Sequence, residues 1–191
     1  MHDIEKILTD SQALLKGHFR LTSGRHGSEY MQCAKVLQYP RYAEQIAENI
    51  TASFEKGSVD IVLSPAVGGI LVGHEVARRL GAKSVFAERV NGVMTLRRGF
   101  EIPAGARVLV AEDVVTTGLS TRDVIAIITA AGAVLAGTCC IVDRTGGTID
   151  FGVKFAAAYS VAMASYAPEE CPLCKAGIPI TTPGSKGVSG A

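Results

Sequence analysis

The stretch that decides the fold is VLVAEDVVTTGLS, residues 108–120. Its first four residues are apolar, which is typical of a strand buried on both faces of a parallel sheet. Two adjacent acids, Glu112 and Asp113, follow at once, and two unpaired carboxylates cannot both point into an apolar core. A small, hydroxyl-rich turn over residues 116–120 then opens a helix. The stretch therefore predicts a strand–turn–helix unit with two acids at the carboxyl end of the strand.

The chemistry of this turn suits a phosphorylated sugar. Carboxylates accept hydrogen bonds from sugar hydroxyls. Backbone N–H groups at a helix N-terminus attract a phosphate, and Gly118 allows the backbone to approach a ligand closely. The spacing is neither GxxxxGK[ST] nor GxGxxG, so it indicates neither a nucleotide P-loop nor a dinucleotide-binding fold. A structural role, in which the acids cap the helix or pair with arginines, is the alternative.

Strand-like and helix-like segments alternate on both sides of this unit. The dipeptide Asn91-Gly92 predicts a hairpin between residues 88–90 and 93–97, and Pro40 is a typical first residue of a helix. The other expected helices cover residues 3–16, 68–80 and 120–131, and the other expected strands cover 59–64, 84–87, 108–111, 133–142 and 155–162. This alternation predicts an α/β fold, a parallel twisted sheet flanked by helices on both faces. Ligands of such sheets bind at the carboxyl ends of the strands, here the loops at 64–69, 112–120 and 143–147.

Composition and charge exclude several classes of function. The 191 residues suffice for a single domain, which we expect to span residues 1–191. The net charge of +1 and the lack of a basic run give no reason to expect nucleic acid or an anionic membrane as a partner. No apolar run is long enough to span a membrane, so we expect a cytoplasmic protein. The odd number of cysteines, five, argues against a disulfide framework.

The C-terminal tail, residues 168–191, contains a Cys-x-x-Cys spacing. Cys171 and Cys174 match a zinc knuckle, but a structural zinc needs two more ligands, and the sequence has neither a second CxxC nor a paired-histidine motif. We interpret the segment as a turn with reduced thiols, followed by a frayed end; a metal shared across a dimer is the alternative. His26 and His74 are interpreted as surface or helix residues.

Two motifs resemble a known family. Residues 108–120 resemble the phosphoribosyl-diphosphate (PRPP) signature of the type I phosphoribosyltransferases: a strand, two acids, two apolar residues, then Thr-Thr-Gly. The sequence GHFRLTSGR at residues 17–25, followed by Tyr30, resembles the opening of the orotate phosphoribosyltransferases, where it forms a hood over the base. The resemblance runs over roughly residues 15–165. It implies the type I fold, with residues 1–36 contributing the hood, and transfer of a phosphoribosyl group from PRPP to orotate in pyrimidine biosynthesis.

The resemblance also implies roles for individual residues. Glu112 and Asp113 would face the ribose hydroxyls, and the turn after them would wrap the 5′-phosphate. The expected PRPP-binding residues are Glu112, Asp113, Val114, Val115, Thr116, Thr117, Gly118, Leu119, Ser120 and Arg89, with Val67, Gly68 and Gly69 in the turn for pyrophosphate. The expected orotate-binding residues are Thr116, Arg144, Tyr30 and Ser23. The expected catalytic residues are Arg89, Asp113 and Arg97.

The sequence departs from the family in two loops. Gly69 stands where the better-studied bacterial branch often has a lysine. Residues 87–100 correspond to the mobile catalytic loop, but its lysines and histidine have no clear match, and Arg97 and Arg98 are the nearby cations. The resemblance further implies Mg²⁺ bound through PRPP without a direct protein ligand, and a homodimer with shared active sites. A purine or uracil phosphoribosyltransferase and a non-catalytic PRPP-sensing regulator are the alternatives.

Overall fold

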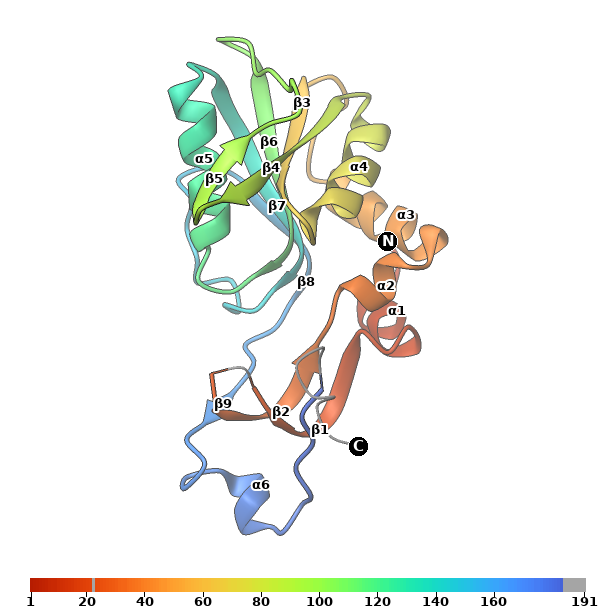
Figure 1. Ribbon diagram of the computed structural model, residues 1–191. Helices are drawn as coiled ribbons and strands as arrows, with labels where there is room; N and C mark the ends of the chain where they lie inside the picture. The colour runs from red at the N-terminus through yellow and green to blue at the C-terminus, as the bar shows by residue number, and fades with distance from the viewer. Residues whose placement is uncertain (22, 184–191) are drawn as a thin grey trace.

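The computed structural model describes residues 1–21 and 23–183, which form a large lobe and a small lobe (Figure 1). Each lobe is built around its own sheet. In chain order the elements are α1 (Ile4–Asp10), β1 (Leu14–Arg20), β2 (His26–Met31), α2 (Ala34–Leu37), α3 (Pro40–Thr51), β3 (Ile61–Pro65), α4 (Gly69–Leu80), β4 (Lys83–Val90), β5 (Val93–Leu96), β6 (Arg107–Val115), α5 (Leu119–Ala130), β7 (Val134–Asp143), β8 (Phe155–Ser160), β9 (Ser165–Tyr166) and α6 (Pro172–Lys175).

The large lobe contains a six-stranded sheet in the order β5-β4-β3-β6-β7-β8. All neighbours pair in parallel except β5, which forms the predicted hairpin with β4 through the pair Val90 and Val93. Helices α3 and α4 pack on one face and α5 on the other, as Figure 1 shows. The predicted α/β architecture with helices on both faces is therefore confirmed.

Strand β6 lies in the middle of this sheet and contains residues 108–115, the apolar run and the two acids. Residues 108–111 are 0% exposed, because β3 and β7 cover their edges and helices cover both faces. The strand continues past these residues to Val115, which pairs with Asp143 at the end of β7. The two acids thus belong to the strand itself, and the carboxyl ends of β3, β6 and β7 meet at one edge of the sheet.

The N-terminal helix is shorter than the sequence predicts. An α-helix over residues 3–16 is wrong, since α1 ends at Asp10 and Gln12 has a φ of +57°. Leu14 and Leu15 begin β1 and pair with Met31 and Tyr30 of β2. Their helical spacing was coincidental, because the pairing with β2 decides their conformation. The apolar side chains of α1 join the main core of the large lobe.

The small lobe combines the N-terminal hairpin with the C-terminal segment. Its antiparallel sheet has the order β1-β2-β9, and Phe19 forms a further bridge with Thr181. The backbone N–H of Arg20 donates to the Thr181 carbonyl at 2.9 Å. The expected turn around the two cysteines is ordered and contains α6. The expected frayed end at residues 184–191 lies outside the described residues.

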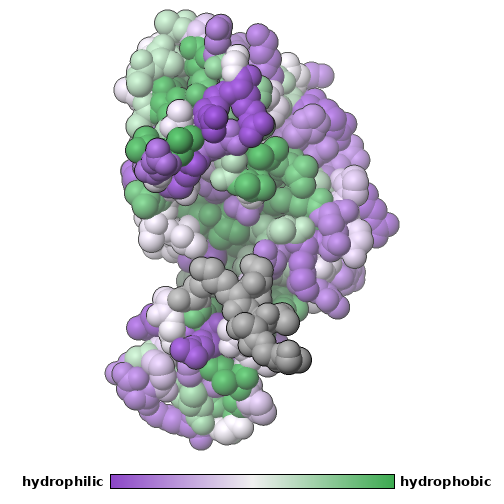
Figure 2. All heavy atoms as spheres, viewed as in Figure 1, coloured by the Kyte–Doolittle hydropathy of each residue, from purple (hydrophilic) through white to green (hydrophobic). Residues whose placement is uncertain are grey.

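The surface of the molecule is mixed. Figure 2 shows the two lobes and, on the face of the large lobe turned toward the viewer, apolar areas between polar ones. Large apolar side chains that are exposed include Val67 (82%), Leu71 (53%), Val93 (65%) and Leu119 (62%). Among the residues that the structure describes, no helix combines the length and the hydropathy needed to cross a bilayer.

Candidate active site at the carboxyl ends of the parallel strands

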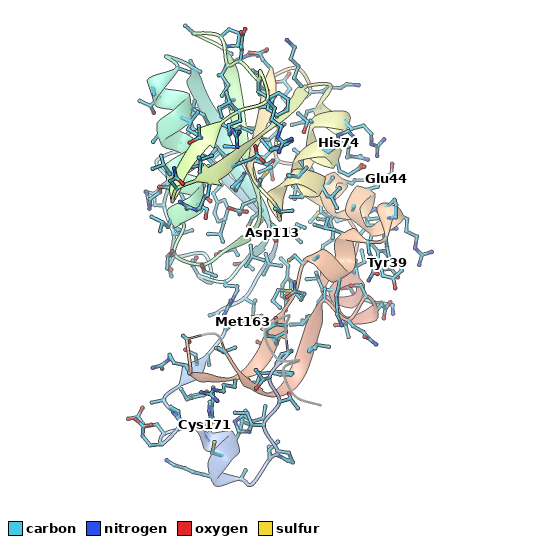
Figure 3. The ribbon with its side chains drawn as sticks, viewed as in Figure 1. Tyr39, Glu44, His74, Asp113, Met163 and Cys171 are labelled. Atoms are coloured by element: carbon cyan, nitrogen blue, oxygen red, sulfur yellow. The ribbon has the colours of Figure 1, made fainter. Side chains whose placement is uncertain are left out.

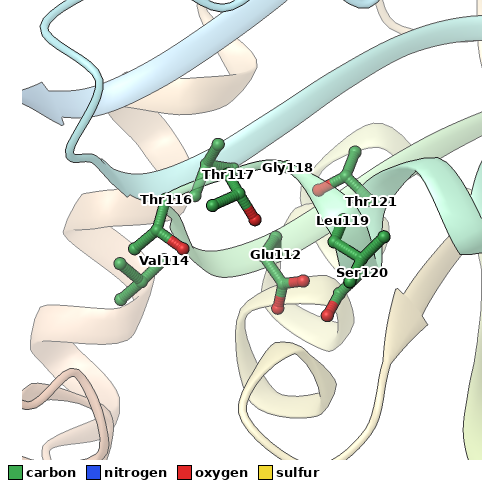
Figure 4. Close-up of a pocket in the computed structure, with 9 residues that line it drawn as sticks. Glu112, Val114, Thr116, Thr117, Gly118, Leu119, Ser120 and Thr121 are labelled. Atoms are coloured by element: carbon green, nitrogen blue, oxygen red, sulfur yellow. The ribbon is translucent and has the colours of Figure 1, made fainter. Parts of the chain in front are cut away.

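A pocket of about 200 Å³ opens where β6 leads into α5. Figure 4 shows the lining side chains, which come from the end of the strand, the turn and the first residues of the helix. They are Glu112, Val114, Val115, Thr116, Thr117, Gly118, Leu119, Ser120 and Thr121. Gly118, the residue just before α5, has a φ of +73° and has no side chain that could cap the helix. The first N–H groups of α5 are thus not capped by a side chain, and the threonine and serine hydroxyls lie beside them.

The acidic pair beside this pocket has no cationic partner. Glu112 is only 7% exposed, and among the described residues neither acid forms an ion pair. Burial, together with the adjacent Asp113, raises the pKa of Glu112 to about 9. Asp113 accepts a hydrogen bond from the Val114 N–H at 2.8 Å. The acids neither cap α5 nor pair with arginines, so their remaining oxygens are available to hydroxyl groups or to a cation.

The turn after β3 lies directly against the acidic pair. A β-carbon built at Gly68 would come within 2.6 Å of the carboxyl carbon of Asp113, and one at Gly69 within 2.9 Å of the Ala111 carbonyl oxygen. The Ala66–Val67 peptide bond in this turn is cis. Two glycines thus allow the turn after β3 to approach the end of β6, and the expected pyrophosphate and ribose sites are brought together.

The turn after β7 is held by one buried carboxylate. Asp143 accepts hydrogen bonds from the N–H and hydroxyl of Thr145, from the Gly147 N–H and from the Ser160 hydroxyl, at 2.6–2.8 Å. Burial alone would raise the pKa of Asp143, but these hydrogen bonds outweigh it and lower the pKa. The network positions Arg144, whose backbone N–H donates to the Val115 carbonyl at 2.9 Å. The Nε of Arg144 is buried and has no partner among the described residues.

The expected catalytic arginines lie elsewhere. Arg89 on β4 donates to Asp123 on α5 at 2.6 Å and to the Gly92 carbonyl at 2.9 Å, and it does not line the pocket. Arg98 pairs with Glu88 at 2.8 Å. Arg97 is exposed in the turn after β5, and no ion pair involves it within residues 1–21 and 23–183. The structure thus brings neither Arg89 nor Arg97 to the pocket.

Comparison with known proteins decides the family. The phosphoribosyl transferase domain family matches residues 33–154. The chain is 51% identical to the orotate phosphoribosyltransferase of Pelotomaculum thermopropionicum over 184 residues, which cover 96% of this chain and 97% of that one. It is 53% identical to the orotate phosphoribosyltransferase of Heliobacterium modesticaldum over 182 residues, 94% and 95% of the two chains. The chain belongs to the orotate phosphoribosyltransferase family.

Solved structures of the same fold agree with this family. The crystal structure of orotate phosphoribosyltransferase from Aeropyrum pernix matches with a TM-score of 0.71 at 23% identity, covering 83% of this chain and 93% of that one. At this identity the likeness shows the fold alone, the type I phosphoribosyltransferase fold. The resemblance seen in residues 108–120 and 17–25 is confirmed by these comparisons.

The residues that the family resemblance assigns to the base lie in both lobes. Tyr30 on β2 donates to Gln32 Oε1 at 3.0 Å, and its ring centroid lies 5.9 Å from that of Phe19. Ser23 is exposed in the turn between β1 and β2. Both belong to the small lobe, whereas Thr116 and Arg144 belong to the large one. The Cys33 thiol, 3.8 Å from the Asp113 carbonyl oxygen, joins the segment after β2 to the acidic pair.

Sequence reasoning singled out Cys171 and Cys174 in the small lobe but missed the two histidines that lie beside them. His26 is not a surface residue, since it is 8% exposed and lies 3.2 Å from the Cys174 sulfur through its Nδ1. His18 lies beside the same sulfur. His74, as expected, is an exposed residue of helix α4. The signal in the sequence was weak, because the two histidines face each other across a hairpin and the cysteines follow about 150 residues later.

Proposed function

We propose that the chain transfers the 5-phosphoribosyl group of PRPP to orotate, giving orotidine 5′-monophosphate and pyrophosphate. The observation that carries the proposal is the unpaired acidic pair, Glu112 and Asp113, beside a pocket at the N-terminus of α5. The full-length similarity to chains named orotate phosphoribosyltransferase supports the choice of base. A purine or uracil phosphoribosyltransferase and a PRPP-sensing regulator are not favoured by these relatives.

The ribose phosphate part of PRPP would bind at the pocket. The carboxyl oxygens of Glu112 and Asp113 that remain free beside their backbone hydrogen bonds would accept hydrogen bonds from the 2′- and 3′-hydroxyls. Backbone N–H groups and hydroxyls of the 114–120 turn would hold the 5′-phosphate, at the positive end of the α5 dipole. From this pocket the rest of PRPP would extend toward the turn after β3, which lies against Asp113.

The pyrophosphate would lie against the turn at residues 65–69. Val67, Gly68 and Gly69 would contact it through the backbone, since none of these residues carries a charge. Arg89 is the expected cation for the leaving group, but its guanidinium is paired with Asp123 at 2.6 Å. Arg89 would therefore exchange Asp123 for pyrophosphate when PRPP binds. Arg97 is exposed at the end of β5 and would serve the leaving group in this subunit or in a neighbouring one.

The orotate carboxylate would bind to Arg144. A guanidinium matches a carboxylate in a two-point interaction, and the unpartnered Nε of Arg144 offers one of the two donors. Thr116, at the start of the turn between β6 and α5, would make a second contact with the base. Tyr30 and Ser23 of the small lobe would cover the base and keep water from the reacting atoms.

The reaction breaks the bond between the anomeric carbon and the pyrophosphate oxygen and forms a bond from that carbon to a ring nitrogen of orotate. The electron pair of the broken bond leaves with pyrophosphate, and the ring proton is lost to solvent. Positive charge develops on the ribose near Asp113, and negative charge develops on the leaving group. The Asp113 carboxylate would stabilise the first charge, and Arg89, once released from Asp123, would stabilise the second.

Mg²⁺ is part of the proposal. The oxygen-rich pair Glu112 and Asp113 fits the vicinity of a hard cation, which prefers oxygen ligands and keeps several waters, and a cation there would lower the raised pKa of Glu112. We assign the ion no direct protein ligand; PRPP oxygens and water would hold it, and the acids would contact the ribose. When bound, the ion would neutralise charge on the pyrophosphate.

A cytoplasmic homodimer completes the proposal. None of the five cysteines, all among the described residues, forms a disulfide, which suits a reducing compartment. Val67 exposes an apolar side chain in the turn for pyrophosphate, as Leu71 does on α4 and Val93 on β5, the strand just before Arg97. A second copy of the chain that covers these residues would bring its own β4–β5 hairpin toward the turn for pyrophosphate. Light scattering coupled to size-exclusion chromatography tests the dimer, and a monomer at catalytic concentrations would exclude shared sites.

The activity is tested by mixing the chain with PRPP, Mg²⁺ and one base at a time. We expect loss of orotate absorbance and no product with uracil, adenine or guanine. Turnover with a purine instead of orotate would overturn the choice of base, and PRPP binding without turnover on any base would favour the regulator. Asp113→Asn should lose most of the activity while unfolding at the wild-type temperature; a rate near wild type would remove the ribose role.

A further inference from the structure

The small lobe gathers four metal-ligating side chains around one point. His18 comes from β1, His26 from β2, and Cys171 and Cys174 from the segment around α6, where Figure 3 labels Cys171. One ligand atom of each lies within 4.8 Å of all the others. We propose that these four side chains bind one structural zinc ion, which joins the N-terminal hairpin to the C-terminal segment.

The distances fit a tetrahedral site. With Zn–N bonds of about 2.0–2.1 Å and Zn–S bonds of about 2.3 Å, neighbouring ligand atoms of a tetrahedron lie about 3.3–3.8 Å apart. His18 Nε2 lies 3.2 Å from His26 Nδ1, 3.5 Å from the Cys171 sulfur and 3.7 Å from the Cys174 sulfur. His26 Nδ1 lies 3.2 Å from the Cys174 sulfur. These four distances match the edges of such a tetrahedron to within a few tenths of an ångström, and the other two pairs lie within 4.8 Å, so a bound zinc ion would draw them together by up to about 1 Å.

A second hydrogen bond prepares His18 as a ligand. Its Nδ1 lies 2.7 Å from the Ile178 carbonyl oxygen. A carbonyl only accepts, so Nδ1 carries the proton, and Nε2 keeps its lone pair toward the other three side chains. Metal-bound histidines characteristically donate their second N–H in this way, which fixes the tautomer and the ring orientation.

Hydrogen bonding alone does not account for the cluster. The neutral ring of His18 has a single lone pair, at Nε2, and three groups crowd within 3.7 Å of it. One lone pair cannot accept from two thiols and an imidazole at once. A central cation gives every member a bond. Two thiolates and two imidazoles are a common donor set of structural zinc, and two thiolates balance the charge of the ion.

The small lobe also needs such a link. Among the described residues, the interior of this lobe is formed by His18 (3% exposed), His26 (8%), Cys171 (0%) and Phe19 (6%), rather than by an apolar cluster. Of the buried residues of β1, β2 and β9, only Leu14 belongs to one of the three apolar core clusters. Small units with little core are usually stabilised by metals or disulfides. A closed site with four protein ligands leaves no open position, so the ion would be structural.

The first test uses the wild-type chain, purified without a histidine tag under reducing conditions. We expect about one zinc ion per chain by elemental analysis and a lower unfolding temperature after treatment with a strong chelator. Replacement by Co²⁺ should give the intense visible absorption of a tetrahedral thiolate site. A metal-free chain that takes up neither Zn²⁺ nor Co²⁺, or a Cys171–Cys174 disulfide in the reduced preparation, would overturn the proposal.

The second test uses variants at the exposed ligand. Cys174→Ser should lose most of the zinc and the cobalt spectrum, whereas Cys174→His should keep the zinc with an altered cobalt spectrum. His74→Gln, an exposed histidine on α4 outside the cluster, is the control and should keep the wild-type zinc content. Equal zinc content in Cys174→Ser and the wild type would contradict the site. These readouts are independent of catalytic activity.

Discussion

Gly68 lies directly against the carboxylate of Asp113, so closely that a β-carbon at residue 68 would come within 2.6 Å of the Asp113 carboxyl carbon. Real side chains do not approach each other to this distance. The turn after β3 and the acidic end of β6 therefore share one space, which is possible only because residue 68 has no side chain. This contact joins the proposed pyrophosphate and ribose sites.

We expect Gly68→Ala to reduce kcat/KM on the order of 100-fold, because the new methyl group displaces either the turn or the Asp113 carboxylate from its position for PRPP. Steady-state kinetics with PRPP as the varied substrate measure the loss. Gly81→Ala is the control: Gly81 has a φ of +74° at the end of α4 and no neighbour within 4 Å of a β-carbon. That variant should lose stability and keep its affinity for PRPP. Equal kinetic losses in the two variants would contradict the prediction.

Stability should fall as the pH rises from about 5 to 9. The pKa of Glu112 is raised from 4.5 to about 9 in the folded chain, so between these values the folded state binds more protons than the unfolded state. The free energy of unfolding then decreases with pH, by up to about 1.4 kcal/mol per unit from this group. Urea unfolding at several pH values measures the slope. Glu112→Gln should flatten it, while Glu55→Gln, on an exposed side chain, should not.

Arg144→Lys should raise the KM for orotate about 10- to 100-fold and leave the KM for PRPP near wild type. Lysine keeps the charge but loses the planar two-point match to a carboxylate, and a hydrogen bond to a charged group is worth about 1.5–3 kcal/mol. Initial rates with each substrate varied in turn separate the two effects. Arg122→Lys is the control, since Arg122 donates to the Asp150 carbonyl and stacks on Phe151 outside the site. A similar rise in both KM values would remove Arg144 from orotate binding.

Asp143→Asn should destabilise the chain by about 2–4 kcal/mol. The new amide nitrogen would replace a carboxylate oxygen that now accepts two hydrogen bonds, and it would face the two donors without accepting from them. The pKa of Asp143 is lowered on folding, so its contribution is present at neutral pH and is lost as the pH falls through the acidic range. Chemical denaturation at pH 7 and pH 4 measures both effects. Asp150→Asn is the control, since the Asp150 carboxylate accepts one hydrogen bond, from the Gly152 N–H, which an amide oxygen can also accept. Equal destabilisation by both variants would contradict the role of the network.

Local pattern was sufficient for most of the large lobe. Strand β6, the hairpin at Asn91-Gly92 and helix α4 with Gly81 at its end follow from apolar runs, turn residues and caps that act over a few residues. The acidic pair and the turn after it could likewise be read in the sequence, because one strand–turn–helix unit carries all of them. Helix α1 was overextended, since the strand conformation of Leu14 and Leu15 depends on pairing with residues further along the chain.

The sequence by itself determined the α/β alternation, the family and the residues at the carboxyl ends of β3, β6 and β7, because each of these signals lies within one continuous segment. Only the tertiary structure decided that Gly68 touches Asp113, that Arg89 is held by Asp123, and that two histidines of a hairpin meet two distant cysteines. Such contacts join segments separated by up to about 150 residues. Residue spacing reports the local conformation of a chain, whereas the packing of sheets and loops brings distant side chains together.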